Sequence, residues 1–235
     1  MNFNLNKIKS GIDKNLLEIC LRDVVDSTND FCKRQKNNKK FFLCISENQT
    51  HGKGRSGKSW SSPSLGNIYM SLSYLDNKNN SPLSLITGSV VYYVLKKITN
   101  SNDLGLKWPN DIILDNKKIG GILVEKEISK KSIKNIIGIG INFKLDEKEN
   151  WWDDLSRFKF LDRDEVINSI VKILIDYIQH EKFDWKTIWM QGCIHLNKEI
   201  KIEYSDKSIH KGQFIDINID GSMNIKIDSE IKRFD

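Results

Sequence analysis

Hydrophobic residues follow two different spacings along this chain. Several stretches have the apolar pattern of buried strands, continuous in some and alternating with small polar residues in others, at residues 16–25, 41–46, 67–75 and 133–143. Residues 104–128 continue this pattern, but a proline-containing turn at 107–111 and a polar turn at 115–118 divide them. We therefore expect three further strands between residues 104 and 128.

Two longer segments have their apolar residues at helical spacing, residues 81–100 and 163–181. Ser81 stands where it would cap the first helix. Asp162 and Glu165 form a capping-box pattern at the start of the second helix. Strands and helices thus occur together in the first part of the chain, which indicates an α+β fold.

The pattern changes from residue 197 onward. Short alternating segments follow one another there, with turns expected at 205–208 and 220–222 and no helical spacing. A unit of about forty residues buries too little apolar surface to fold well alone, so we expect it to pack on the rest of the protein. We divide the chain into a larger domain, residues 1–195, and a small all-β domain, residues 196–235.

Composition narrows the class of protein only a little. The chain has 235 residues, 39% of them hydrophobic and 29% charged, and a formal net charge of +6. Such a modest basic excess suits an anionic ligand as well as a nucleic acid. The four cysteines and four histidines show no metal-binding spacing, and we see neither a signal peptide nor an apolar run of membrane-spanning length. We expect a cytoplasmic protein.

Residues 51–60, HGKGRSGKSW, match the spacing of a phosphate-binding P-loop. A P-loop joins a strand directly to the N-terminus of a helix, where backbone N–H groups converge on the phosphates. Here Pro63 and Gly66 interrupt any helix after the loop, and the next element has a strand pattern. We therefore reject the P-loop interpretation.

The same ten residues still form an unusual loop. Glycines alternate in it with cationic side chains, at Gly52, Lys53, Gly54, Arg55, Gly57 and Lys58. Glycines let a backbone approach a ligand closely, and cations attract an anion, so the loop is suited to order over a charged small molecule. A solvated basic loop or a contact with nucleic acid phosphates remains open on this segment alone.

Further candidate segments carry polar chemistry at the ends of expected strands. Residues 26–30, DSTND, offer hydroxyl and amide groups for a neutral polar ligand, although alone they are only a helix cap. Lys107 ends a strand beside the rigid turn of KWPND, where its charge can meet a phosphate or carboxylate. In GIGIN, residues 138–142, glycines expose the strand backbone and Asn142 offers a donor and an acceptor.

Taken in order, these segments resemble the biotin protein ligases, also called biotin–[acetyl-CoA-carboxylase] ligases. That family has a Ser-Thr-Asn segment, a G-R-G-R-x-G-R-x-W loop, K-W-P-N-D, G-G-I-L-V-E and G-x-G-x-N. The corresponding residues here are Ser27 to Asn29, Gly52 to Trp60, Lys107 to Asp111, Gly120 to Glu125 and Gly138 to Asn142. The resemblance covers residues 20–145, with a looser fit in the terminal β unit. Lys53 stands where the family usually has arginine, which keeps the charge but loses the bidentate fork.

The resemblance implies a fold and a reaction. The fold would be a mixed, mostly antiparallel sheet flanked by helices, as in class II synthetases, with a C-terminal SH3-like β-barrel. The reaction would use ATP and biotin to form biotinyl-5′-AMP, with Mg²⁺ held by the ATP phosphates rather than by the protein. Biotin would then pass to a lysine of the biotin carboxyl carrier protein of acetyl-CoA carboxylase.

The resemblance also assigns roles to single residues. Lys107 and Arg55 would be catalytic. Biotin would be bound by Ser27, Thr28, Asn29, Gln49, Lys53, Gly54, Arg55 and Lys107, and ATP or the adenylate by Gly52, Arg55, Lys58, Trp60, Asn110 and Asn142. The histidines would have no role in the site, and we interpret Asp153 and Asp154 as a solvated turn rather than a metal site.

Other functions remain to be separated from this one. A lipoate or octanoyl ligase or transferase would share the fold, and a basic nucleic acid-binding module would use the cationic loop. About fifteen residues precede the first expected strand, too few for a helix-turn-helix, so we expect no DNA binding. The sequence leaves a monomer and a homodimer equally open.

Overall fold

The computed structural model describes residues 3–36, 38–64, 66–76, 81–129, 132–146, 149–203 and 209–234. The larger part of the chain forms a seven-stranded sheet with strand order β1-β2-β3-β7-β6-β5-β4. Its strands are β1 (Leu17–Val25), β2 (Phe41–Gln49), β3 (Ile68–Asp76), β4 (Leu104–Lys107), β5 (Asp111–Leu114), β6 (Lys117–Ile128) and β7 (Ile133–Ile141). Only β1 and β2 pair in parallel; every other neighbouring pair in this sheet is antiparallel. The expected α+β fold with a mixed, mostly antiparallel sheet is confirmed.

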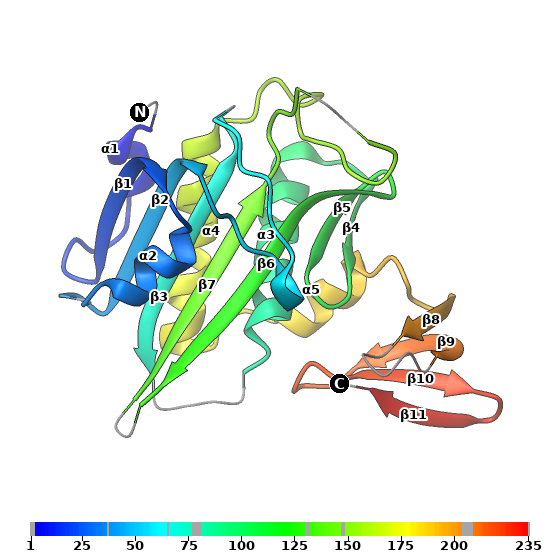
Figure 1. Ribbon diagram of the computed structural model, residues 1–235. Coiled ribbons are helices and arrows are strands. Elements are labelled where there is room, and N and C mark those ends of the chain that lie inside the picture. Colours follow the sequence, from blue (N-terminus) through cyan, green and yellow to red (C-terminus); the bar gives the residue numbers. More distant parts are fainter. Residues whose placement is uncertain are drawn as a thin grey trace.

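Helices cover both faces of this sheet, although unequally. They are α1 (Leu5–Ile8), α2 (Thr28–Arg34), α3 (Leu83–Thr99), α4 (Arg163–His180) and α5 (Trp185–Gly192). In Figure 1, α3 and α4 lie behind the sheet, while α2 and the cyan segment that follows β2 lie in front of it. The front face is therefore covered less by helices than the back face. None of the helices in the described part of the chain has the length and apolar character needed to span a bilayer.

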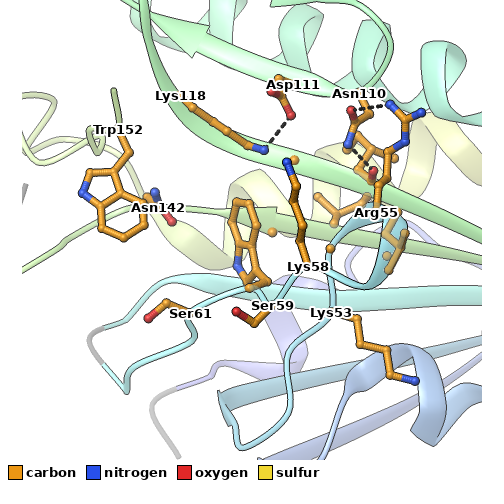
Figure 2. A pocket seen from close by; sticks show the side chains of 18 of the residues that line it. Lys53, Arg55, Lys58, Ser59, Ser61, Asn110, Asp111, Lys118, Asn142 and Trp152 are labelled. Atoms are coloured by element: carbon orange, nitrogen blue, oxygen red, sulfur yellow. Dashed lines mark hydrogen bonds and ion pairs between the residues drawn. The ribbon is translucent and has the colours of Figure 1, made fainter. Parts of the chain in front are cut away.

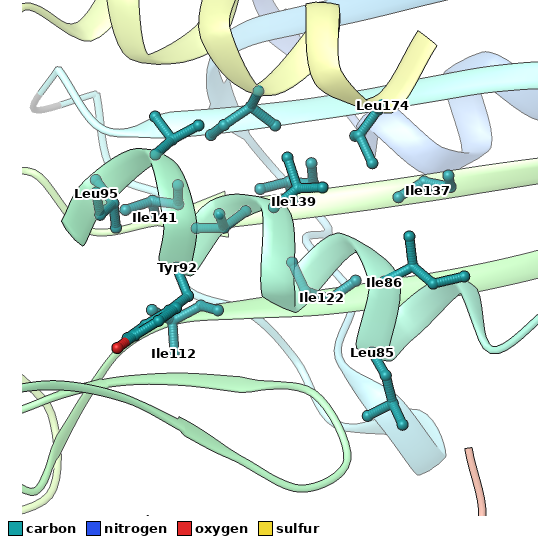
Figure 3. Close-up of a cluster of buried hydrophobic side chains, with 14 of the residues drawn as sticks. Leu85, Ile86, Tyr92, Leu95, Ile112, Ile122, Ile137, Ile139, Ile141 and Leu174 are labelled. Atoms are coloured by element: carbon teal, nitrogen blue, oxygen red, sulfur yellow. The ribbon is translucent and has the colours of Figure 1, made fainter. Parts of the chain in front are cut away.

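The main core lies between the sheet and the helices behind it. Figure 3 shows Ile122, Ile137 and Ile139 of the sheet facing Ile86 of α3 and Leu174 of α4. These five side chains are at most 3% exposed. Packing of this face explains why apolar residues recur at helical spacing in α3 and α4.

The ends of these helices test the expected caps. Asp162 accepts hydrogen bonds from the backbone N–H groups of Asp164 and Glu165, so it caps α4 as expected. The Ser81 cap is wrong: Pro82 occupies the N-cap position of α3, and no side chain caps it. The Pro82 carbonyl accepts the N–H of Ile86 at 3.1 Å, so the helix begins one residue later than a Ser81 cap requires.

The last part of the chain forms a four-stranded antiparallel sheet in the order β11-β10-β9-β8. Its strands are β8 (Glu199–Glu203), β9 (Ile209–Ile217), β10 (Met223–Ile227) and β11 (Glu230–Phe234). The expected turn at 205–208 lies outside the described residues. The expected turn at 220–222 falls between β9 and β10. Closure of this sheet into an SH3-like barrel stays an expectation.

The small sheet is docked on the larger part of the protein, as expected. Phe214 is fully buried, and its ring centroid lies 6.1 Å from that of Trp189 of α5. The indole N–H of Trp108 donates to the Gly221 carbonyl at 3.1 Å. The two units share one buried hydrophobic cluster, so no break in the packing marks residue 195. The division of the chain into two domains there stays a proposal.

Candidate active site

One cavity lies on the front face of the large sheet, with a volume of about 1110 Å³. Its walls come from the start of α2, the end of β2, the glycine-rich loop of residues 51–60, the β4–β5 turn and strands β6 and β7. The lining includes nearly every residue that the sequence assigned to ligand binding: Ser27, Thr28, Asn29, Gln49, Lys53, Gly54, Arg55, Lys58, Trp60, Lys107, Asn110 and Asn142. Gly52 is not among them, because it lies behind the wall and its carbonyl accepts the Trp60 N–H at 2.8 Å.

One end of the cavity is built from neutral polar side chains that bond to one another. Ser27 caps α2, with its hydroxyl accepting the Asp30 N–H at 3.4 Å. The Gln49 side-chain oxygen accepts bonds from the Thr28 N–H at 2.8 Å and the Thr28 hydroxyl at 3.1 Å. Ser71 Oγ lies 2.7 Å from Thr28 Oγ1. These bonds fix each donor and acceptor in one orientation.

The Asn29 amide is held from both sides. Its Oδ1 accepts a bond from Ser71 Oγ at 2.6 Å, and its Nδ2 donates to Glu125 Oε2 at 2.8 Å. The same Nδ2 lies 3.3 Å from the Leu123 carbonyl of β6. A Cβ at Gly138 of β7 would come within 2.4 Å of Asn29 Oδ1, so only glycine leaves room for this amide. Gly138 of the GIGIN motif thus provides the space that the Asn29 amide occupies.

The glycine-rich loop forms a small hairpin of its own within the segment that connects the antiparallel strands β2 and β3. The Gly54 N–H donates to the Lys58 carbonyl at 2.6 Å, and Lys53 pairs with Ser59 in an isolated bridge. Its tip is a three-residue 3₁₀ turn, Arg55–Gly57, with Gly57 at a φ of 74°. Among the described residues, the next element after the loop is β3 and no α-helix N-terminus follows it, which confirms the rejection of the P-loop interpretation.

Trp60 closes the loop by packing onto the sheet. Added Cβ atoms at Gly121 of β6 and Gly140 of β7 would lie 3.1 Å and 2.8 Å from its indole ring. Lys118 Nζ lies 5.3 Å from the centroid of the same ring. The Trp60 Nε1 atom is buried, lies 2.9 Å from the position of an added Cβ at Gly140, and has no hydrogen-bond partner among the described residues.

Cationic side chains gather at the other end of the cavity. Arg55 Nη1 donates to Asn110 Oδ1 at 3.2 Å, and Asn110 Nδ2 donates to the Ile122 carbonyl at 3.0 Å. Figure 2 shows Lys58 extending toward the same space as Lys118. Lys107, exposed at the end of β4, completes this group. Such a cluster is suited to an anion and especially to a polyphosphate.

Lys53 stands apart from the other cations. Its Nζ lies 2.5 Å from Asp30 Oδ2, and Figure 2 shows its side chain directed away from Arg55 and Lys58. It still lines the cavity. In this arrangement its charge is bound to a carboxylate of the protein.

The comparison with protein families decides the assignment. Residues 21–142 match the profile described as "Biotin/lipoate A/B protein ligase family". The chain belongs to this family.

Relatives and solved structures agree with that assignment. The Escherichia coli protein named "Bifunctional ligase/repressor BirA" is 29% identical over 229 residues, which cover 91% of this chain and 71% of the relative. The Mycobacterium tuberculosis "Biotin--[acetyl-CoA-carboxylase] ligase" is 23% identical, covering 78% of this chain and 66% of the relative. A structure of the biotin protein ligase from Aquifex aeolicus in complex with biotin and ATP has a TM-score of 0.75 and 26% identity, covering 92% of this chain and 95% of that one.

Within this biotin/lipoate ligase fold, the structure adds cavity residues that the sequence analysis did not assign. Lys118 and Asp111 form an ion pair of 2.6 Å and both line the cavity. Trp152 also lines it, with a ring centroid 4.6 Å from that of Trp151. Lys118 stands two residues before the G-G-I-L-V-E segment and pairs with Ile113 of β5, and a cation at the start of this strand was the signal that could have identified it.

His195 lines the cavity, and the expectation that it has no role in the site stays an expectation. The Ile194 N–H donates to the Leu106 carbonyl at 3.1 Å, which brings residue 195 beside the end of β4. Burial, and then the positive charges of Lys107 and Lys198, hold the pKa of His195 below its usual value. His195 is therefore a neutral imidazole at physiological pH.

Asp153 and Asp154 do not form a solvated turn. Asp154 is 1% exposed and accepts bonds from the Leu145 N–H at 2.8 Å and the Ser156 hydroxyl at 2.6 Å. Its carboxylate stabilises the backbone after β7. Across the described ranges of the chain, no three His, Cys, Asp or Glu residues gather in a way that would hold a metal ion.

Proposed function

We propose that this chain is an ATP-dependent biotin–protein ligase that forms biotinyl-5′-AMP and transfers biotin to a lysine of a biotin carboxyl carrier protein. The observation that carries the proposal is a single cavity with fixed neutral donors and acceptors at one end and cations at the other. Biotin has the same polarity: a neutral ureido ring at one end and a carboxylate at the other. The biotin ligase relatives support the same assignment.

Ser27, Thr28, Asn29 and Gln49 would bind the ureido ring. This ring offers N–H donors and a carbonyl acceptor, so it needs partners of both kinds in fixed positions. Thr28 and Asn29 are 4% and 3% exposed and are already oriented by Gln49, Ser71 and Glu125. Little side-chain freedom is then lost on binding, which favours affinity and selectivity.

The cationic end would bring two anions together. In the first step a biotin carboxylate oxygen attacks the α-phosphorus of ATP, the bond to the β-phosphate oxygen breaks, and pyrophosphate leaves. Two unit charges about 4 Å apart repel by about 4 kcal/mol at an effective dielectric constant of 20. Lys107 with Lys53 would bind the carboxylate, and Lys107 with Arg55 the α-phosphate, so that Lys107 bridges the reacting groups.

The nucleotide would occupy the part of the cavity between the loop and β7. Lys58 would meet the phosphates, while Trp60, Asn110 and Asn142 would shape the remainder of the ATP site. Gly52 would support Trp60 through the bond to its N–H. The described residues offer no carboxylate cluster for a metal ion, so Mg²⁺ would arrive with the ATP phosphates, whose negative charge it reduces. All other charge stabilisation is then left to the cations of the protein.

In the second step the amine of the carrier lysine attacks the carbonyl carbon of the mixed anhydride, an amide forms, and AMP leaves. This route needs no nucleophile from the protein. The buried thiols agree with that: burial raises the pKa of Cys32 to about 12 and the pKa of Cys44 further still. We place the reaction in the cytoplasm, where ATP and the carrier protein would both be present.

The experiment is biotin-dependent exchange of radiolabelled pyrophosphate into ATP, followed by labelling of a biotin carrier domain. We expect exchange with biotin and Mg·ATP and none when biotin is omitted. Lipoate in place of biotin tests the other specificity in the family name. Exchange at background with biotin, using folded protein, would contradict the proposal; exchange with lipoate alone would reassign the substrate.

A further inference from the structure

A chain of ion pairs connects the glycine-rich loop with the polar end of the cavity. Lys53 Nζ of the loop lies 2.5 Å from Asp30 Oδ2, and Asp30 Oδ1 lies 3.4 Å from Lys33 Nζ. Lys33 Nζ in turn lies 2.5 Å from Glu125 Oε1 of β6. The other oxygen of Glu125 accepts the Asn29 amide N–H at 2.8 Å. One continuous set of contacts thus runs from Lys53 to Asn29.

These pairs are more protected from water than an ordinary surface salt bridge. The side chains of Asp30, Lys33 and Glu125 are 21%, 24% and 27% exposed, whereas that of Lys53 is 43% exposed. Burial raises the pKa of Asp30, but the bonds with Lys53 and Lys33 outweigh it, and the pKa lies below its usual value. Asp30 is therefore charged at neutral pH and attracts both lysines.

Besides the packing of Trp60 on the sheet, two polar side chains attach the loop on opposite sides of the cavity. On the α2 side, Lys53 is bound to Asp30; on the side of the β4–β5 turn, Arg55 is bound to Asn110. Gly54, the residue between Lys53 and Arg55, donates its N–H within the loop, to the Lys58 carbonyl at 2.6 Å. The Asp30 contact thus holds the Lys53 side chain toward α2, next to the backbone bond from the His51 N–H to the Asp26 carbonyl at 2.7 Å.

We propose that Asp30, Lys33 and Glu125 are positioning residues, which hold the Lys53 half of the loop over the cavity and orient the Asn29 amide through one ion-pair chain. They act through Lys53 and Asn29 and need not touch a substrate. The effect on the loop follows from the fold alone; the effect on the adenylate rests on the proposed ligase function. Loss of Asp30 then loosens the loop and speeds release of biotinyl-AMP, while adenylation at saturating substrate changes little.

Limited trypsin digestion without ligand measures the position of the loop directly. Trypsin cuts after Arg55 and Lys58, and we expect Asp30→Asn to raise the cleavage rate at these sites by ~2- to 5-fold, as for loss of one partly exposed ion pair. Asp30→Glu should restore most of the protection. Arg34→Gln is the matched control, because Arg34 lies on the same helix but pairs with Asp26 at 2.7 Å, outside the chain.

A double-mutant cycle separates this mechanism from a general loss of stability. If Asp30 positions the loop through Lys53, Asp30→Asn should add nothing to the cleavage rate in a Lys53→Gln background. In the otherwise unchanged protein, Asp30→Asn should raise the KM for biotin and the adenylate dissociation rate by ~2- to 5-fold, and leave kcat for pyrophosphate exchange within about 2-fold. Lys33→Gln replaces Asp30→Asn if that variant does not fold.

The outcomes are distinct. Unchanged cleavage in a folded Asp30→Asn or Lys33→Gln variant overturns the proposal, as does an equal effect of Asp30→Asn on the cleavage rate with and without Lys53. Tighter biotin binding by Asp30→Asn also overturns it, since Asp30 would then compete with the ligand for Lys53. If the unmodified protein shows no biotin-dependent exchange while the cleavage pattern holds, the ligase function has failed and the ion-pair chain has not.

Discussion

The two ends of the cavity are built in opposite ways. At the polar end, Thr28, Asn29 and Ser71 are at most 4% exposed and bonded to each other or to neighbouring strands. At the cationic end, Lys58 and Lys107 are exposed on flexible stems. The comparison shows that one cavity offers fixed geometry to neutral groups at one end and exposed positive charge to anions at the other.

The physical reason lies in how each interaction depends on distance. A neutral hydrogen bond weakens steeply when its length or angle changes, so its partners must be held in place. A Coulomb interaction falls only as the inverse of distance, so a lysine needs only to be close. Mutations at the polar end should therefore affect folding and affinity together, and those at the cationic end should affect rate with little effect on folding.

The largest effect should come from Lys107→Ala at the cationic end. Removing the charge that bridges carboxylate and phosphate should slow adenylation by ~10²-fold or more. Because Lys107 is exposed, the midpoint of thermal unfolding should change little. Single-turnover formation of biotinyl-AMP measures the rate, and Lys97→Ala, at an exposed position in the last turn of α3, is the control. Adenylation at the unmodified rate in Lys107→Ala would contradict the role of this residue.

At the polar end, Gly138→Ala should weaken biotin binding by ~10-fold or more and also destabilise the fold by ~1–3 kcal/mol. Its Cβ would lie 2.4 Å from Asn29 Oδ1 and displace the amide, while ATP binding stays unchanged. Gly88→Ala in α3 is the matched control, since its Cβ would meet Leu106 at an ordinary 3.7 Å. Calorimetry with biotin and thermal melts provide both readouts; normal affinity in Gly138→Ala would show that the Asn29 orientation is not required.

Arg55→Gly should have a smaller effect, on retention of the intermediate. It removes a loop cation and the contact with Asn110, so biotinyl-AMP should leave the cavity ~2- to 10-fold faster. The released anhydride would then label exposed lysines of unrelated proteins. Biotin incorporation into serum albumin, detected with streptavidin, measures the leak, and labelling no higher than that by the unmodified protein would count against this role of Arg55.

The sequence identified some residues of this site and missed others. Ser27, Thr28 and Asn29 were identified because they follow one another after a strand, and a pattern of consecutive residues is visible in the sequence. Trp152 and His195 were not identified, because each reaches the cavity from an element distant in sequence. Lys118 was not identified, because its ion pair with Asp111 forms only when β5 and β6 lie side by side. The sequence pattern also could not reveal that Lys53 is bound to Asp30, since that contact depends on where α2 and the loop meet in space.

The fold shows the same limit. Strand and helix positions followed from apolar spacing, and the docking of the C-terminal sheet followed from its small size. The start of α3 did not follow, because Pro82 rather than Ser81 stands at the N-cap position and no side chain caps the first turn. Local patterns predict elements well, but the exact residue at a helix end depends on competing backbone acceptors.

The smallest expected effect concerns an ion pair outside the cavity, between Arg34 and Asp26. The hydrogen bond from Arg34 is the main cause that lowers the pKa of Asp26 from 3.8 to about 2. A lowered carboxyl pKa adds stability that is present above pH 4 and is lost as the pH falls toward 2. Since the pair is largely exposed, Arg34→Gln should reduce the unfolding free energy at neutral pH by no more than about 0.5 kcal/mol.

Urea melts at pH 7 and near pH 2 measure this difference, which should shrink at the lower pH. A difference that stays constant between the two would mean that Arg34 contributes through packing rather than through the charge of Asp26. Activity should not change, because neither side chain lines the cavity.

Calorimetric titration of the unmodified protein with biotin and, separately, with lipoate tests the central claim most directly. The fixed donors and acceptors at the polar end suit a ureido ring, whereas the dithiolane ring of lipoate has no N–H or carbonyl to satisfy them. We predict tight binding of biotin and no measurable binding of lipoate at the same concentrations. Binding of lipoate as tight as that of biotin, or no binding of biotin by folded protein, would contradict the assignment of this cavity to biotin.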